Sequence, residues 1–103
     1  MKQLLVLIAQ HNIKDDIVDT LMSLDYLSGF SLVDICGFSR EHSQYNLKEQ
    51  VEGYRQFYKF EIMHPQQSQE ALLTTLAQVC QHNPCRYWIV PIASNGVLGQ
   101  GQP

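Results

Sequence analysis

Five of the cysteine and histidine residues of this chain are spaced or placed so that they could bind a metal ion. The stretch "CQHNPC" places Cys80, His82 and Cys85 within six residues, and zinc and copper sites favour thiolate and imidazole together. A closed structural zinc site needs four ligands, so a fourth would have to come from His11, His42 or another subunit. Cys80, His82, Cys85, His11 and His42 are therefore the candidate ligands of a copper or zinc site.

The same residues also have an interpretation without a metal. Cys80 would be a small hydrophobic residue on the buried face of a helix, and His82 a solvated cation near the C-terminus of that helix. A catalytic interpretation has less support, because no catalytic signature surrounds any of the three cysteines. Glu41 and His42 could act as acid and base, but adjacent polar residues on a loop are typically only solvated. We predict that the protein is not an enzyme.

The hydrophobic pattern predicts the elements that would position these residues. The run "LLVLIA" and the alternation in "QFYKFEIM" indicate strands, and apolar residues at helical spacing indicate two helices. Strands are expected at 4–9, 30–39, 56–63 and 85–92, and helices at 13–24 and 69–80. This β-α-β-β-α-β order predicts an α+β, ferredoxin-like domain with two helices on one face of a four-stranded antiparallel sheet. The domain would span 1–93, followed by a flexible tail over 94–103.

The first helix has start signals of its own. Asn12 offers an N-cap oxygen, and Asp15 falls in the first turn, where the helix dipole favours an acid. Ser68 is the corresponding N-cap candidate for the second helix. Four residues at helical spacing are expected in the core: Ile17, Leu21, Leu72 and Leu76.

The predicted topology brings the polar candidates to one end of the domain. The candidate metal ligands, the N-terminus of the first helix and the connection Ser39–Gln56 are expected there, and His64 at the opposite end. Ligand sites favour polar groups on loops held by a rigid scaffold, so this end is the predicted site. The connection has too little apolar content to hold one conformation alone, so a ligand or partner would order it. The alternative is a loop that simply packs on its neighbours.

The helix-free face of the sheet is predicted to be apolar. Strand 85–92 places Tyr87 and Ile89 on one face and Trp88, Val90 and Ile92 on the other. Burial of apolar surface contributes about 25 cal/mol per Å², so several such side chains favour an oligomer assembled through this face. The alternative is a monomer with an apolar sheet face.

Charge and cysteine content restrict the partners and the compartment. Acidic residues outnumber basic ones 10 to 7, and the formal net charge is −3, which argues against binding to nucleic acid or to a membrane surface. No segment has the roughly 20 apolar residues that span a bilayer, so no membrane insertion is expected. The opening "MKQLLVLIAQ" lacks a cleavage site, and the cysteine number is odd. We expect a cytoplasmic protein with reduced thiols.

The stretch "GFSREHSQYNLKEQVEGYRQFYKFEIM" resembles the PII signalling proteins. In these ferredoxin-like trimers the second strand ends in a G-F-G-R-type segment, here Gly37, Phe38, Ser39 and Arg40, and opens into a long loop. From "KQLLVLIA" to "YWIVPI" the chain further resembles an uncharacterised family of small PII-like proteins associated with heavy-metal efflux systems.

The resemblance implies a homotrimer that binds a small effector in clefts between subunits. The loop would carry the signal to a partner such as a membrane transporter or an efflux component. The effector-binding candidates are Gly37, Phe38, Arg40, Glu41 and Arg86. PII proteins hold the phosphates of ATP or ADP with Gly, Lys and other basic residues around their last strand, whereas this chain has "QHNPCRYW" and "IASNGVLG" there. The effector and any cofactor are therefore not identified by the sequence. The alternative function is a copper- or zinc-binding buffer or sensor in metal tolerance.

Overall fold

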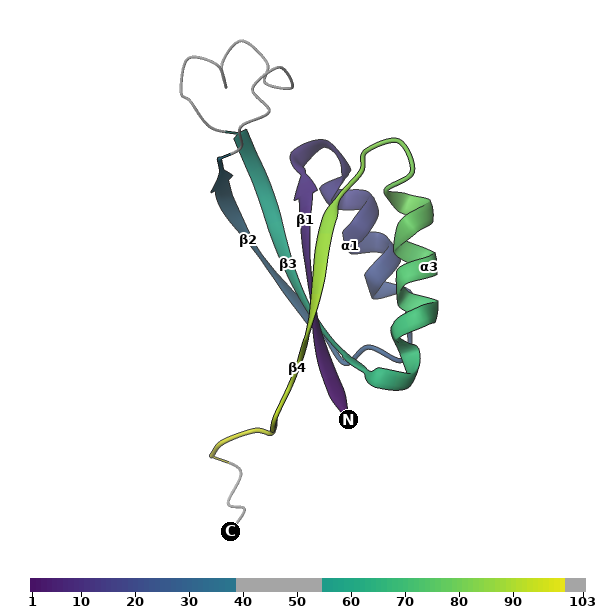
Figure 1. The fold of residues 1–103 in the computed structure, drawn as a ribbon, viewed down its shortest axis with the longest axis vertical. Helices are drawn as coiled ribbons and strands as arrows, with labels where there is room; N and C mark the ends of the chain where they lie inside the picture. The colour runs from purple at the N-terminus through teal and green to yellow at the C-terminus, as the bar shows by residue number, and fades with distance from the viewer. Residues whose placement is uncertain (39–54, 100–103) are drawn as a thin grey trace.

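The fold is a single sheet with two α-helices packed on one of its faces (Figure 1). The computed structural model describes residues 1–38 and 55–99. The strands are β1 (Lys2–Gln10), β2 (Phe30–Gly37), β3 (Arg55–Pro65) and β4 (Arg86–Pro91). The α-helices are α1 (Lys14–Met22) and α3 (Gln69–Val79), and 3₁₀ helices η1 (His11–Ile13) and η3 (Gln66–Ser68) precede them.

The sheet has the strand order β2-β3-β1-β4, and every neighbouring pair is antiparallel. The register pairs Leu5 with Ile62 and Ile89, and Leu32 with Phe60. This topology confirms the predicted ferredoxin-like fold. Because β1 and β2 both pair antiparallel with β3, they end at the same end of the sheet. We call it the upper end, as it is drawn in Figure 1, and the opposite end the lower end.

The first helix begins differently from the prediction. Asn12 lies inside η1 and is not a cap: its side-chain nitrogen donates to Asn83 Oδ1 at 3.0 Å, and α1 starts without a side-chain cap. Asp15 is in the first turn, as predicted. The helix ends at Met22. The next residue, Ser23, donates its hydroxyl to the Thr20 carbonyl at 2.6 Å, and such a side-chain bond competes with the backbone hydrogen bonds of a helix.

The second helix is closer to the prediction. Ser68 occupies the N-cap position of α3, but its side chain makes no capping hydrogen bond. At the other end Cys80 lies just past the helix, with its backbone N–H donating to the Leu76 carbonyl at 2.9 Å. The turn that follows leads directly into β4 and ends the helix before Pro84, which cannot continue it.

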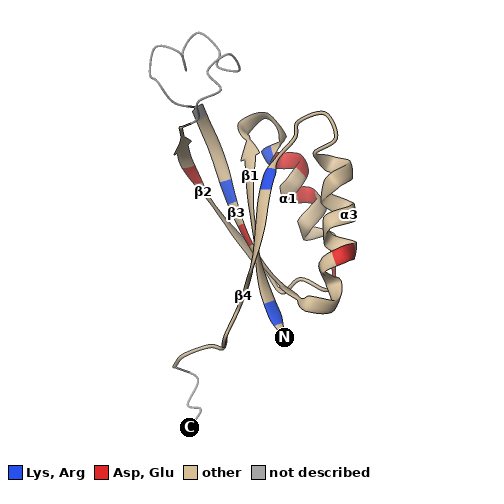
Figure 2. Ribbon diagram, viewed as in Figure 1, with Lys and Arg blue, Asp and Glu red and all other residues tan. Residues whose placement is uncertain are grey.

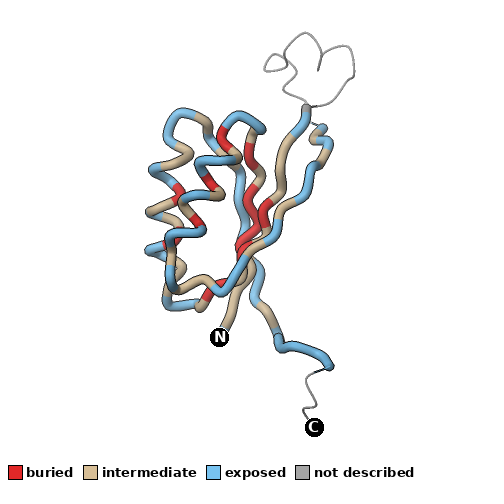
Figure 3. The backbone as a smooth tube through the Cα atoms, turned by 180° about the vertical axis from the view of Figure 1, so that it is seen from behind, coloured by how far each residue is buried: buried red, intermediate tan, exposed pale blue. Residues whose placement is uncertain are grey.

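The core lies between the helices and the sheet (Figure 3). Alternate residues of β1 and β3 face the helices, as the period of a strand requires. The four core residues predicted in the helices are all buried. The buried apolar cluster consists of Leu5, Leu7, Ala9, Ile13, Ile17, Leu21, Phe60, Ile62, Leu72 and Leu76.

The face without helices, here called the open face, is also apolar. Trp88 is 46 % exposed and Val90 is 42 % exposed on β4. On β1, Val6 lies opposite Trp88 on one side and Glu61 on the other, and these longer side chains leave it only 5 % exposed. The described chain therefore leaves the apolar side chains of Trp88 and Val90 on this face in contact with solvent.

Candidate functional site

A cluster of three polar or aromatic side chains lies at the upper end, near the ends of β2 and β3. His11 Nε2 is 2.7 Å from Asp34 Oδ1, so the imidazole and carboxylate share a hydrogen bond. The His11 ring also stacks on Tyr58, with 4.3 Å between ring centroids and an interplanar angle of 26°. Asp34 and Tyr58 are direct partners across β2 and β3, so the sheet itself fixes their separation. We call His11, Asp34 and Tyr58 the upper cluster.

Lys14 adds a positive charge beside the upper cluster. Its Nζ lies 5.4 Å from the centroid of the Tyr58 ring, a cation–π distance, and 3.3 Å from Asp15 Oδ1. Charged residues of both signs are located on β2, β4 and α1 toward this end (Figure 2). The His11 and Asp34 side chains are 40 % and 67 % exposed, so a ligand from solvent can reach both.

The connection between α3 and β4 is tied to the same end. The Asn12–Asn83 hydrogen bond joins it to η1, and the Cys85 thiol donates to the Asn83 carbonyl at 3.2 Å. Asn83 also donates its backbone N–H to the Cys80 carbonyl at 3.1 Å, closing a tight turn. His11 and the two cysteines are thus at one end of the domain, as the topology predicted.

Only part of the predicted metal-ligand set is brought together. Cys80 and Cys85 are half-buried against the core and interact with each other. Burial, followed by the hydrogen bond and the charge of Cys80, raises the pKa of Cys85 to about 12, so its thiol is protonated at neutral pH. His82 is exposed and His11 is engaged by Asp34. Within residues 1–38 and 55–99, no group of three or more His, Cys, Asp or Glu side chains could hold a metal ion.

The described candidate effector residues lie at the end of β2 and at the start of β4. Gly37 is the last residue of β2 and pairs with Arg55, and Phe38 follows it with 76 % of its surface exposed. Arg86 begins β4 opposite Ile8 and is exposed. Two further effector candidates, Arg40 and Glu41, and the candidate metal ligand His42 lie outside the described residues.

The lower end has different chemistry. His64 lies there, as predicted, and is completely buried. Its Nδ1 donates to the Pro65 carbonyl at 2.9 Å, whereas its Nε2 is buried with no hydrogen-bond partner in the described structure. Gln3, its partner across β1 and β3, likewise has a buried side-chain oxygen with no partner there. Both atoms are closed to solvent.

Asp34 and Tyr58 were not among the residues predicted for the site. The available signal was the position of Asp34, which shares the helix-facing side of β2 with Phe30 and Leu32. The partner of Asp34 comes from η1, and His11 was considered only as a metal ligand. Tyr58 packs against the core while stacking on His11.

The family comparison accounts for nearly the whole chain. The family model described as "Protein of unknown function (DUF3240)" matches residues 1–99. The chain belongs to the DUF3240 family. A crystal structure of a DUF3240 family protein from Shewanella baltica OS155, at 2.40 Å resolution, is similar to it with 66 % sequence identity. The similarity covers 94 % of this chain and 96 % of that one, with a TM-score of 0.81. No curated protein matches the chain.

The DUF3240 relative has a fold similar to that of this chain. The residues of the upper cluster lie on elements of that fold in this chain. His11 follows β1, Asp34 lies in β2 and Tyr58 in β3. In the part of this DUF3240 chain that the structure describes, no helix has the length and apolar character needed to cross a membrane.

Proposed function

We propose that this DUF3240 protein is a non-enzymatic, PII-like trimer that senses a small effector. The effector binds between subunits at the upper end, and the segment 39–56 passes the signal to a partner such as a transporter. The proposal rests on the upper cluster, in which His11 Nε2 is 2.7 Å from Asp34 Oδ1 and so links η1 to β2. This contact lies three residues before Gly37, where β2 ends opposite Arg55, the first residue of β3.

The position of the upper cluster supports a link between ligand binding and the segment 39–56. Asp34 is three residues before Gly37, and Tyr58 is three residues after Arg55. A ligand that bonds to Asp34 or His11 would act on the strands that hold both ends of the segment. A ligand shifts a conformational equilibrium only by its different affinity for the two states, so an effector at the upper cluster must bind the two states of the segment with different affinity.

The open face supports the trimer. Trp88, Val90 and Val33 are 42–50 % exposed there, and exposed large apolar side chains on one face of a sheet favour a contact with another chain. A trimer built on this face would place β4 of one subunit beside its neighbour. Arg86, exposed at the upper end of β4, would then be available to the cleft between subunits.

Light scattering and hydrogen exchange on one sample test this function. We expect a trimer mass at micromolar concentration, and slower exchange over 39–56 when the effector is added; ATP, ADP and AMP are the first probes. Arg40→Ala and His11→Ala should weaken binding, whereas Glu70→Ala, at the exposed start of α3, should not. A monomer mass, or exchange over 39–56 that is already slow and stays unchanged with every probe, would contradict the proposal.

A metal-binding function is the second candidate, because Cys80 and Cys85 lie together and half-buried at the same end. Protons compete with metal for thiolates, so affinity for copper or zinc should fall as the pH is lowered. Calorimetry should show binding lost when Cys80, His82 and Cys85 are replaced by Ser, Asn and Ser, and retained when the exposed Cys36 is replaced by Ser. Unchanged binding in the triple variant would exclude this site.

A further inference from the structure

The C-terminal segment after β4 exposes two large apolar side chains. Ile92 donates its backbone N–H to the Lys2 carbonyl at 3.2 Å, and every residue from Ala93 to Gly99 is exposed. Val97 is 66 % exposed and Leu98 is 99 % exposed. The segment continues away from the sheet beyond the end of β4 (Figure 1), so its own domain does not cover these side chains.

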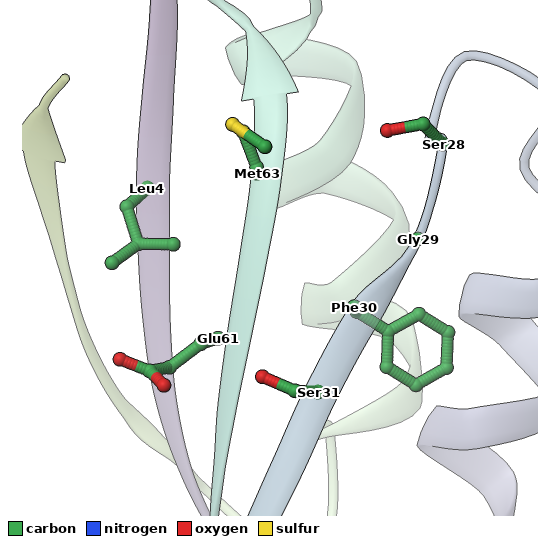
Figure 4. A pocket seen from close by; sticks show the side chains of 7 residues that line it. All are labelled: Leu4, Ser28, Gly29, Phe30, Ser31, Glu61 and Met63. Atoms are coloured by element: carbon green, nitrogen blue, oxygen red, sulfur yellow. The ribbon is translucent and has the colours of Figure 1, made fainter. Parts of the chain in front are cut away.

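A shallow hollow of about 370 Å³ lies at the lower end of the open face (Figure 4). It is lined by residues of β1, β3 and the start of β2: Leu4, Ser28, Gly29, Phe30, Ser31, Glu61 and Met63. Leu4 and Met63 provide apolar surface, and Ser31 and Glu61 place oxygen atoms beside them (Figure 4). The hollow has room for a leucine-sized side chain, and the oxygens can accept hydrogen bonds from an extended backbone.

We infer that the Val97–Leu98 segment of one copy binds in this hollow of a second copy. The inference rests on the proposed trimer, because the hollow belongs to the open face that would form the interface. It also explains two features at once: an apolar tail that the described residues of its own chain leave exposed, and an apolar hollow at the end of the sheet from which that tail departs.

A second copy fits better than the same chain. To reach its own hollow the tail would have to reverse direction beside β1, whereas it leaves β4 pointing away from the sheet (Figure 1). In a symmetric homo-oligomer every copy makes the same contacts, so one tail–hollow contact repeats between all subunits. In a closed trimer each hollow would receive one tail.

Disulfide trapping between copies tests the inference. The native cysteines are first replaced by Ser. One variant of this protein then carries Leu98→Cys and a second variant carries Met63→Cys, and the two variants are refolded together and oxidised. We expect a disulfide-linked pair of the two chains. The matched control replaces Met63→Cys by Asp19→Cys, on the exposed side of α1, and should give no such pair.

The outcomes separate this inference from the proposed function. A trimer in which Leu98→Cys and Met63→Cys do not link between chains, or link only when both are in one chain, would overturn the inference and leave the trimer intact. A monomer mass for the unmodified protein would overturn both. Replacing Val97 and Leu98 together by Ser should raise the concentration at which the trimer dissociates by at least about tenfold. An unchanged dissociation concentration would also count against the tail contact.

Discussion

The two faces of the sheet have similar apolar side chains and opposite surroundings. On the face covered by α1 and α3, Leu5, Phe60 and Ile62 are completely buried. On the open face, Trp88 and Val90 remain 46 % and 42 % exposed. The covered face is completed by helices of the same chain, so its packing supports the fold of one subunit. Within residues 1–38 and 55–99 no helix covers the open face, which is the face that we propose for contact between subunits.

The comparison predicts that mutations on the two faces affect different equilibria. A change on the covered face should lower the free energy of unfolding. A change on the open face should chiefly alter assembly. Two measurements test this separation. Two further measurements test the smaller effects of Cys85 and Asp34, near the upper end, on stability and ligand binding.

The largest effect is expected for Phe60→Ala. This side chain is fully buried in the core cluster, and removing a buried phenylalanine costs about 3–5 kcal/mol of unfolding free energy. Val33→Ala on the open face, where Val33 is 50 % exposed, should cost less than about 1 kcal/mol in the monomeric state. Urea denaturation at low protein concentration measures both. Equal losses for the two variants would show that the faces do not differ in this way.

Trp88→Asp should disrupt assembly without unfolding the subunit. A carboxylate held in a subunit interface would be desolvated with no partner, which costs at least about 2 kcal/mol. Light scattering should show a shift to monomer, with circular dichroism unchanged. Met22→Asp, on the exposed end of α1 at 73 % exposure, is the matched control and should keep the mass. An unchanged mass for Trp88→Asp would mean that this part of the open face lies outside the interface.

The Cys85 thiol should make stability depend on alkaline pH. Its pKa is raised from the ordinary 9.0 to about 12, first by burial and then by Cys80. The folded state therefore holds the thiol proton more tightly than the unfolded state. This contribution is complete below about pH 9 and is lost as the pH rises through 9 toward 12. Burial and then Asp25 raise the pKa of Tyr26, which adds a loss of the same sign.

Comparison of variants isolates the Cys85 contribution. Denaturation between pH 8 and pH 10.5 should show a smaller alkaline loss of stability in Cys85→Ala than in the unmodified protein. Cys36→Ala, at an exposed position, should retain the full loss. The same pH dependence in all three proteins would contradict the assignment to Cys85.

The smallest effect is expected for Asp34→Asn. The His11–Asp34 pair is short at 2.7 Å but exposed to solvent, and such pairs contribute no more than about 1 kcal/mol. Stability should therefore change little, while binding of an effector at the upper cluster should weaken. Parallel denaturation and titration measure the two. A loss of stability larger than that of Val33→Ala would make the pair a structural element rather than a ligand contact.

The sequence predicted the fold because strand and helix periods leave clear patterns in residues such as Ile17, Leu21, Leu72 and Leu76. It predicted helix starts less well. Asn12 has the chemistry of a cap, but its side chain bonds to Asn83, a residue far along the chain. The upper cluster also depends on residues that are distant in the sequence. His11 and Asp34 come into contact because the sheet places β2 near the end of β1, where η1 begins. Contacts of this kind depend on tertiary geometry, which local patterns do not encode.

The pairing of Gly37 with Arg55 has a practical consequence. These two residues are held at the spacing of neighbouring strands, about 4.8 Å, whatever number of residues connects them. Loop-closure entropy grows slowly with length, so doubling such a connection costs only about 0.6 kcal/mol. The junction after Phe38 is therefore a position where an epitope or a fluorescent reporter can be inserted, and where related chains can differ greatly in length while keeping the same sheet.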